Sequence, residues 1–394
     1  MRNLANAQPN QHTLRILHVV PTYLPATRYG GPIFSVHGLA SAQAALGADV
    51  SVLTTSVDGS EDSPVVHGQA CLLDGVKVWY FRSRWLRRLY FSWAMRQWLK
   101  ANVTTFDVVH LHSVFLFPTN MAARLCIAAG IPYVIAPRGM LVKELINGKR
   151  SLIKSAWIRL FERRTLAKAA CFHATSALEL DDARRLGVPV NNPCVIENGV
   201  ALPEQRKWPA PMQIPYVLYL GRLSWKKNID LLIEACSALP DVHLVLAGAA
   251  DQDSMLEDLR ALTTRFSSQA RVSFLGELKG DEKWPWIQHA RILALVSKNE
   301  NFGNAAAEAL CLGTPVVLTN GVGLAAATAA AGAGWICEAS VESIRAAINS
   351  AFCDPQEAKI CGERGQEWAK KTLGWQAGAS KTMAIYQSFA MSKL

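Results

Sequence analysis

Short apolar runs alternate with longer amphipathic stretches in the first half of the chain. Residues 14–21 (LRILHVVP) are apolar and rich in β-branched side chains, and a glycine-containing loop separates them from a helical pattern over residues 33–46. Further apolar runs predict strands over residues 49–54, 76–81, 108–112, 133–136 and 171–174. Strands that alternate with helices indicate a parallel sheet covered on both faces.

The same alternation restarts in the second half. Several prolines between residues 202 and 215 predict a linker. Beyond it we expect a helix over residues 230–237 and strands over residues 216–220, 242–247, 272–275, 292–296 and 316–319. The long uncharged stretch over residues 316–337 is mostly Gly, Ala and Thr, and it predicts a packed loop and helix instead of a membrane span.

Length and charge narrow the class of protein. A chain of 394 residues suits two domains, and 50% hydrophobic with 18% charged residues excludes a disordered chain. The net charge of +10 lies entirely in residues 1–203, which hold 22 basic and 12 acidic residues, whereas residues 204–394 hold 19 of each. A basic half predicts an anionic partner.

The cysteines and the N-terminus indicate the compartment. The nine cysteines are scattered, without a CxxC or Cys/His cluster, so they predict neither a zinc site nor a disulfide framework. They are typical of small core residues in a reducing environment. The N-terminal segment MRNLANAQPNQHT is polar and lacks an apolar signal core. We therefore expect a cytoplasmic protein.

One strand-to-helix segment of the second half carries the most specific candidate chemistry. Glu300 and Glu308 lie on either side of a predicted helix start at Asn304. Carboxylates there can accept charge-assisted hydrogen bonds from vicinal hydroxyls. The backbone N–H groups of Phe302, Gly303 and Asn304 lie at a helix N-terminus, where free donors suit an anion or a sugar oxygen. Two glutamates alone favour the simpler interpretation of a capped helix with solvated acids.

A second junction supplies positive charge. Gly221 and Arg222 follow the strand over residues 216–220, and Lys227 lies just before the next predicted helix. An arginine fork and a lysine point charge can together neutralise a diphosphate. Taken alone, this spacing also fits ordinary surface charge near a turn.

Three strand ends of the first half add further candidates. Gly30 and Gly31 precede a helix, where glycine lets the backbone approach a phosphate closely. His110 and His112 end a strand and, because side chains alternate, share one of its faces. Arg138 follows the strand over residues 133–136. Each of these segments alone is also consistent with a turn or with a satisfied core residue.

Together these segments resemble the retaining glycosyltransferases of family 4. The resemblance runs from Arg15 to about Tyr386, and its carriers are Gly30-Gly31, His110-x-His112, residues 137–140 (PRGM), residues 196–200 (IENGV), Gly221-Arg222 with Lys227, and Glu300-x7-Glu308 with Asn301-Phe302-Gly303. The stretch over residues 300–315 is a close match. Residues 137–141 are similar to a subgroup concerned with bacterial surface polysaccharides, such as exopolysaccharide, capsule or lipopolysaccharide.

The resemblance implies the GT-B fold. In this α/β architecture two Rossmann-like, doubly wound parallel-sheet domains face each other across a cleft. It places an acceptor-side domain over residues 1–203 and a nucleotide-sugar domain over residues 204–373. The last helix, within residues 374–394, is expected to cross back to the first domain.

The resemblance also implies roles for individual residues. Glu300 would bind hydroxyls of the donor sugar, Glu308 would hold the ribose, and Arg222 and Lys227 would hold the diphosphate. The remaining donor-binding residues by this criterion are Gly30, Gly31, Asn301, Phe302, Gly303 and Asn304. His112 would lie beside the reacting sugar, so the catalytic set is His112, Glu300, Arg222 and Lys227. Arg138 would lie on the acceptor side.

No metal or other cofactor is expected. Asp251 and Asp253 formally match the DxD metal motif of a different glycosyltransferase fold. The resemblance uses no metal, and the cations at Arg222 and Lys227 can stabilise the negative charge that develops on a leaving nucleotide.

The implied reaction is sugar transfer from a UDP- or GDP-sugar to a hydroxyl of a glycan or lipid-linked glycan, with retained configuration. A nucleotide-sugar epimerase of similar fold is one alternative, although the Glu300–Glu308 spacing counts against it. A non-catalytic basic protein that binds membrane or nucleic acid is another. No nucleic-acid-binding signature accompanies the charge, so we expect no nucleic-acid partner.

One basic stretch is a candidate membrane surface. From Arg82 to Lys100 the chain holds six cations, no acid and five aromatic residues. Such a segment is consistent either with a solvated helical face or with peripheral binding to the anionic inner face of the cytoplasmic membrane.

Overall fold

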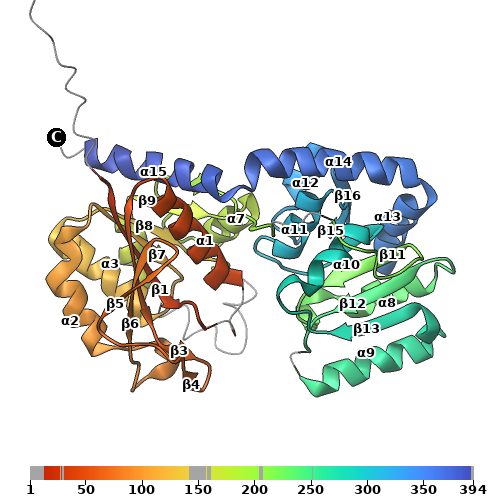
Figure 1. Ribbon diagram of the computed structural model, residues 1–394, viewed down its shortest axis with the longest axis horizontal. Helices are drawn as coiled ribbons and strands as arrows, with labels where there is room; N and C mark the ends of the chain where they lie inside the picture. The colour runs from red at the N-terminus through yellow and green to blue at the C-terminus, as the bar shows by residue number, and fades with distance from the viewer. Residues whose placement is uncertain are drawn as a thin grey trace, which may run out of the picture.

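The computed structural model describes residues 13–26, 28, 31–141, 157, 161–203, 207–250 and 252–391. Two lobes of helices and strands lie side by side along the longest axis of the molecule (Figure 1). Each lobe is built on a parallel sheet with helices packed on it, as the alternating pattern predicts. The GT-B fold expected from the sequence is thereby confirmed.

The sheet of the first lobe has eight strands in the order β10-β9-β8-β7-β1-β2-β6-β5. The strands are β1 (Arg15–Thr22), β2 (Asp49–Thr55), β5 (Ala70–Leu73), β6 (Val76–Phe81), β7 (Val108–His112), β8 (Tyr133–Ala136), β9 (Cys171–Ala174) and β10 (Cys194–Val195). The helices are α1 (Gly31–Ala45), α2 (Trp93–Asn102), α3 (Phe117–Ala129), α6 (Arg163–Lys168) and α7 (Ala177–Arg185). All pairings are parallel except β5 with β6.

The sheet of the second lobe has six parallel strands in the order β13-β12-β11-β14-β15-β16. They are β11 (Tyr216–Leu220), β12 (His243–Ala247), β13 (Val272–Gly276), β14 (Ile292–Leu295), β15 (Val316–Thr319) and β16 (Gly334–Cys337). The helices are α8 (Ile229–Ser237), α9 (Asp253–Arg265), α10 (Lys283–His289), α11 (Asn304–Leu312), α12 (Ala325–Ala331), α13 (Val341–Cys353) and α14 (Pro355–Thr372). Central strands such as β14 are buried on both faces, which explains their unbroken apolar runs.

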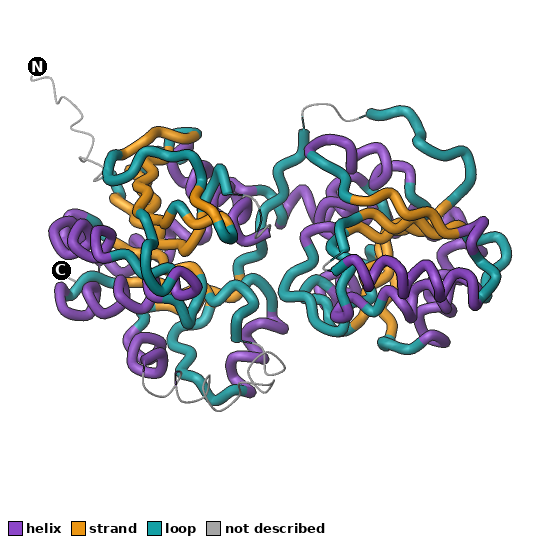
Figure 2. The backbone as a smooth tube through the Cα atoms, turned by 90° about the horizontal axis from the view of Figure 1, so that it is seen from below, coloured by secondary structure: helices purple, strands orange, loops and turns teal. Residues whose placement is uncertain are grey.

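The last helix joins the two lobes. Helix α14 covers the second lobe, and α15 (Trp375–Met391) returns across the first lobe, where it packs on α1 (Figure 1). Seen from below, the C-terminus accordingly lies at the first lobe (Figure 2). At the crossing, the Trp375 ring lies against Gly38 of α1 and against Gly199. A Cβ atom on either glycine would come within 2.3 Å of the ring. The two glycines therefore make room for the indole that fixes the crossover.

Three features differ from the sequence-based prediction. Residues 316–337 contain the predicted strand β15 and helix α12, and in addition the edge strand β16, which the sequence did not predict and which pairs parallel with β15. Strand β5 pairs antiparallel with β6 through a short turn that the helix–strand alternation did not predict. A two-stranded hairpin, β3 (Val57–Asp58) and β4 (Glu61–Asp62), follows β2. Within the part of the chain that the structure describes, no helix has both the length and the apolar character needed to cross a membrane.

Candidate functional site

A cavity of about 930 Å³ lies between the two lobes and is lined by residues of both. Its second-lobe wall is formed where β11, β12, β13 and β14 end, because parallel strands of one sheet bring their carboxyl ends to the same edge. Ten of the predicted site residues line it: Gly31, Arg138, Arg222, Lys227, Glu300, Asn301, Phe302, Gly303, Asn304 and Glu308. Segments far apart in the sequence thus meet in one place.

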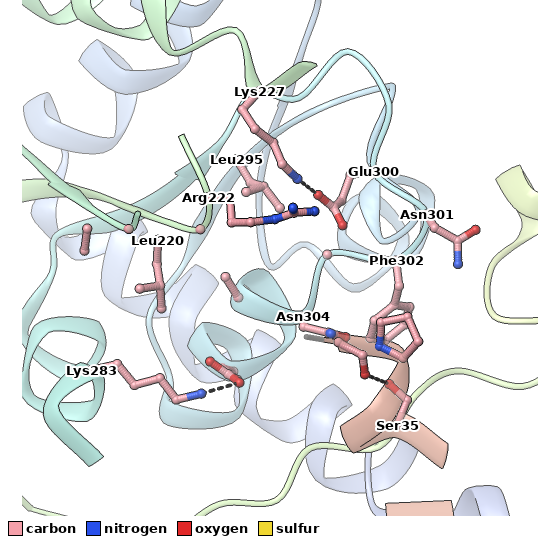
Figure 3. Close-up of a pocket in the computed structure, with 18 of the residues that line it drawn as sticks. Ser35, Leu220, Arg222, Lys227, Lys283, Leu295, Glu300, Asn301, Phe302 and Asn304 are labelled. Carbon is pink, nitrogen blue, oxygen red and sulfur yellow. Dashed lines mark hydrogen bonds and ion pairs between the residues drawn. The ribbon is translucent and has the colours of Figure 1, made fainter. Parts of the chain in front are cut away.

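Glu300 and Lys227 form an ion pair at one end of this wall. The Lys227 ammonium donates a hydrogen bond to Glu300 Oε2, and Figure 3 shows Arg222 extending toward the same carboxylate. Both paired side chains are about one-fifth exposed, which leaves them open to the cavity. The arrangement places one carboxylate and two cations together, so a ligand with hydroxyls beside a phosphate can find partners for both.

Glu308 lines the same cavity and has a partner of its own. Lys283, the first residue of α10, donates a hydrogen bond of 2.6 Å to Glu308 Oε1 (Figure 3). Lys283 is not among the residues predicted from the sequence. Its position directly after β13 and a turn, at the start of a helix, is the same strand-to-helix signal that identified Lys227.

The loop between Glu300 and α11 is held by backbone contacts. Glu300 N–H donates to the Gly321 carbonyl at 2.8 Å, and Gly323 N–H donates to the Glu300 carbonyl at 2.8 Å. Gly303, with φ +101°, precedes the helix in a conformation that favours glycine. Gly303, Asn304 and Ala305 line the cavity, so the N-terminus of α11 lies at its wall.

Asn301 also connects the two lobes. Its amide donates to Thr175 Oγ1 at 2.7 Å, and its carbonyl accepts from Ser176 Oγ at 2.8 Å. Gly139 lies so close that an added Cβ would approach the Asn301 Cβ within 2.9 Å. The predicted donor loop is therefore in direct contact with the first lobe.

The first-lobe wall contributes charge and close backbone approach. A Cβ on Gly31 would lie 2.7 Å from Asn304 Nδ2, so the start of α1 meets the start of α11. Arg138 lines the cavity and donates a hydrogen bond of 2.6 Å to Asn198 Oδ1. Burial lowers the pKa of Arg138 to about 10, so the side chain still carries its charge at neutral pH.

His112 does not line the cavity. It is fully buried, and Arg138, which does line the cavity, contacts its Nδ1 through two guanidinium nitrogens at 3.3 and 3.4 Å. As predicted, His110 and His112 share one face of β7, with ring centroids 4.2 Å apart. Burial is the main cause that lowers the pKa of both rings well below the usual value.

Two predictions lie outside the described residues. These are the predicted donor-binding residue Gly30 and Asp251 of the DxD triplet. Asp253 begins α9, but its side chain is not described. The described residues do contain one group that could hold a metal: nitrogens of His18, His110 and His112 lie within 4.8 Å of one another. This group is in the core of the first lobe, away from Lys227 and Glu300.

The basic stretch from Arg82 to Lys100 is divided by the fold. Trp85 and Trp93 are exposed by 78% and 57%, whereas Trp98 packs inward on Trp79 with ring centroids 4.9 Å apart. Arg87 forms an ion pair with Asp62 at 2.8 Å. The surface of this stretch therefore presents fewer unpaired cations and fewer exposed aromatic rings than the six cations and five aromatic residues of its sequence suggest.

Two family models match the chain. Residues 30–199 match the model "Glycosyl transferase 4-like domain", and residues 203–368 match "Glycosyl transferases group 1". The two matches leave only residues 200–202 between them.

Relatives and solved structures agree with these models. Glycogen synthase of Mycobacterium tuberculosis is 30% identical over 202 residues, which are 49% of this chain and 47% of that protein. The lipopolysaccharide core biosynthesis glycosyltransferase LpsE of Rhizobium meliloti is 32% identical over 120 residues, 30% of this chain and 34% of that one. The chain spans about half the length, or less, of these curated relatives.

Two solved structures share the fold along nearly the whole chain. Sucrose-phosphate synthase from Thermosynechococcus elongatus superposes with a TM-score of 0.75 at 20% identity, covering 96% of this chain and 100% of that one. Anabaena HepE in complex with UDP-glucose superposes with a TM-score of 0.69 at 19% identity, covering 97% and 100%. From its two matched domains and its fold, the chain belongs to the GT-B glycosyltransferases of the GT4 type.

Proposed function

We propose that this protein transfers a sugar from a nucleotide-sugar donor to a hydroxyl of a glycan or lipid-linked glycan, with retention of the anomeric configuration. The observation that carries the proposal is the inter-lobe cavity, where Glu300, Glu308, Arg222 and Lys227 meet the start of α1. Carboxylates suit sugar and ribose hydroxyls, and clustered cations suit a diphosphate.

Different residues of the cavity bind different parts of the donor. In this proposal Glu308, which is paired with Lys283, accepts hydrogen bonds from the ribose hydroxyls, and Glu300 accepts them from the transferred sugar. Lys227 neutralises Glu300 in the free protein. When a diphosphate enters, Lys227 and Arg222 turn to it and stabilise the charge of the departing nucleotide without a metal. With Glu300 binding hydroxyls, the acceptor hydroxyl attacks the anomeric carbon from the same face as the leaving phosphate. The new glycosidic bond forms as the bond to the phosphate breaks, and an oxygen of the departing phosphate takes up the hydroxyl proton.

Surface-polysaccharide synthesis, including lipopolysaccharide, is the proposed setting. LpsE, one of the relatives, is described as a lipopolysaccharide core biosynthesis enzyme, and the sequence around Pro137–Leu141 points the same way. The Anabaena neighbour is described in complex with UDP-glucose, which makes UDP-sugars the first donors to test.

A donor panel tests the reaction and its alternative. The purified protein is incubated with UDP-, GDP- and ADP-sugars, and the products are followed by chromatography and NMR. Slow donor hydrolysis that yields the sugar with its original anomeric configuration supports a retaining transferase. Interconversion of two nucleotide sugars would instead identify an epimerase, and no change of any donor would contradict both activities.

The exposed basic surface is the proposed contact with an anionic inner leaflet. Arg84, Trp85, Arg88 and Trp93 are exposed, and each cation near such a surface contributes about 1 kcal/mol. Co-sedimentation with phosphatidylglycerol vesicles at low and high salt tests it, with R84Q/R88Q as the variant. The matched control is R184Q/R185Q, which removes two cations of α7. Equal binding of both variants, or equal binding to neutral vesicles, would contradict the assignment.

A further inference from the structure

Four imidazoles lie together in the core of the first lobe. They are His18 on β1, His110 and His112 on β7, and His173 on β9. The rings are at most 2% exposed, and their neighbouring centroids are 4.2 to 5.4 Å apart. Such a group of titratable side chains in an apolar core needs a hydrogen-bond pattern that satisfies every ring nitrogen.

The first branch of this pattern begins at the cavity wall. A guanidinium can only donate, so Arg138 requires a lone pair on His112 Nδ1, and a neutral His112 then carries its proton on Nε2. That proton is donated to His18 Nδ1 at 2.8 Å. His18 must in turn donate from Nε2, and it does so to Gln43 Oε1 at 2.7 Å.

The second branch is fixed independently. A backbone carbonyl can only accept, so the contact of 3.0 Å with the Ile196 carbonyl places the His173 proton on Nε2. His173 Nδ1 therefore accepts from His110 Nε2 at 3.2 Å. His110 Nδ1 is left to accept from the Tyr386 hydroxyl at 2.6 Å. All four rings are thus neutral, with the proton on Nε2.

The two branches are joined at one end, and at the other they end close together in the sequence. At one end the Gln43 amide donates to Thr382 Oγ1 at 2.8 Å and to the Tyr386 hydroxyl at 3.4 Å, both on α15. At the other end Arg138 donates to Asn198 Oδ1, two residues beyond the carbonyl that ends the second branch. The crossover helix is therefore connected to the cavity wall through the core.

The partners of Arg138 leave its charge available. His112 Nδ1 and Asn198 Oδ1 are both uncharged acceptors. The charge of Glu179 raises the pKa of Arg138, but this carboxylate already accepts hydrogen bonds from the Gly139 and Thr175 N–H groups at 2.6 and 2.7 Å. Gly139, which follows Arg138, lies against Asn301 in the loop after Glu300, and Arg138 lines the same cavity as Glu300. The cation therefore lies in the cavity proposed for the donor sugar and its phosphate.

We propose that His112 is a positioning residue: the network of neutral histidines holds the Arg138 guanidinium toward the donor's leaving phosphate, and His112 acts on the reaction only through Arg138. The proposal rests on the proposed function, because the phosphate belongs to a nucleotide-sugar donor. Because His112 is buried and does not line the cavity, it can act through Arg138 but cannot contact the sugar directly.

Two further observations favour a hydrogen-bonded network over a metal site. Both ring nitrogens of His18, His110 and His112 already have partners, so a metal would have to displace them. Burial, aided by the charge of Arg138, lowers the pKa of all four rings, that of His18 to about 4. Tyr386 is the other titratable group in contact with the rings, and among the described residues no carboxylate hydrogen-bonds to them.

The network itself is tested without any substrate. Protein labelled with ¹⁵N-histidine gives long-range ¹H–¹⁵N spectra that distinguish Nδ1–H, Nε2–H and doubly protonated rings. Four rings, assigned by single substitutions, are expected in the Nε2–H form and still neutral at pH 5. An Nδ1–H form in any of the four, protonation near pH 6.5, or a change on adding Zn²⁺ would overturn the proposal.

The role of His112 is tested by two near-isosteric variants. In H112N the amide oxygen replaces Nδ1 and keeps an acceptor for Arg138, whereas in H112Q the amide replaces Nε2 and loses it. With a donor that the wild type turns over, H112N should keep kcat within about threefold. H112Q should lower kcat about tenfold or more, as R138Q does, with little change in KM.

A double variant separates action through Arg138 from direct contact. In the R138Q background, H112Q should cause no further loss. If the two losses multiply, or if H112N and H112Q are equally impaired while remaining folded, His112 acts independently and the proposal is wrong. A wild-type protein inactive on every donor would contradict the proposed function instead, and the NMR experiment would still decide the network.

Discussion

The ammonium group of Lys283 lies 2.6 Å from a carboxylate oxygen of Glu308, on the second-lobe wall of the inter-lobe cavity. Lys283 is the first residue of α10, and Glu308 lies within α11, so two separate strand-to-helix junctions supply the pair. Their side chains are 24% and 18% exposed. The pair fixes the glutamate in one orientation while leaving its second oxygen for a ligand hydroxyl.

The Glu308–Lys283 pair gives the first prediction. E308A should weaken binding of the donor nucleotide about ten- to a hundredfold, because a charged hydrogen-bond partner contributes about 1.5–3 kcal/mol. Titration calorimetry with UDP, GDP and ADP measures this loss. The control is E367A, which removes a carboxylate from the exposed Lys371–Glu367 pair of α14. Equal affinity of E308A and E367A would contradict the assigned role.

Neighbouring lysines allow a sharper comparison. K227A should weaken nucleotide-diphosphate binding by a similar factor, because Lys227 lines the cavity beside Glu300. K226A changes the neighbouring lysine of the short 3-10 helix Trp225–Lys227, whose ammonium lies 5.5 Å from the Trp225 ring centroid, and it should bind like the wild type. Equal losses in both variants would point to the overall charge of the turn instead of the specific contact.

Chelation tests the expected independence from metal. Activity should survive EDTA, because Arg222 and Lys227 supply the positive charge that a divalent cation would otherwise bring to the diphosphate. Turnover is measured after dialysis against EDTA and again after adding Mg²⁺ or Mn²⁺. Loss of turnover on chelation, with recovery on adding metal, would return attention to Asp251 and Asp253.

The indole of Trp375 gives a prediction about stability. G38A and G199A should each lower the free energy of unfolding by about 1–3 kcal/mol, because the new methyl group overlaps the ring. G374A is the matched control, since a Cβ there meets nothing within 4 Å. Denaturant unfolding measures all three. A neutral G199A would show that Trp375 can shift without cost.

The histidine network predicts acid sensitivity. Folding holds these rings neutral by lowering their pKa, so the unfolded state binds more protons once the pH falls below about 6.5. The free energy of unfolding should therefore be unaffected by these rings above that pH. Below pH 6.5, each ring should reduce the free energy of unfolding by up to about 1.4 kcal/mol per pH unit. This loss continues until the ring also titrates in the folded protein, which for His18 occurs at about pH 4.

Urea unfolding between pH 8 and pH 5 measures this dependence. A variant such as H173Q, whose amide can still donate to the Ile196 carbonyl, should show a shallower loss toward acid pH than the wild type, whatever its stability at pH 8. Identical pH dependence in the two proteins would contradict the assignment of a depressed pKa to His173.

The local pattern of apolar residues determined where the main strands of this protein lie. Apolar runs at strand spacing located β1, β7, β11 and β14 within a residue or two, because a strand buried on both faces must be apolar along its length. Residues just after those strands had to lie at one edge of each sheet. For that reason the sequence identified Arg222, Lys227 and Glu300 as candidates at the same edge of the second sheet, and the structure shows that they line one cavity.

The tertiary structure decided which of those residues meet, and through what. Lys283 pairs with Glu308 across two helices, and His18, His112 and Arg138 join through three different segments. Such contacts leave no periodic pattern in the sequence, because each depends on how segments distant in the sequence pack against one another. The sequence placed His112 at the end of a strand. Only the packing of Arg138 over it decided that its imidazole faces the core and not the cavity.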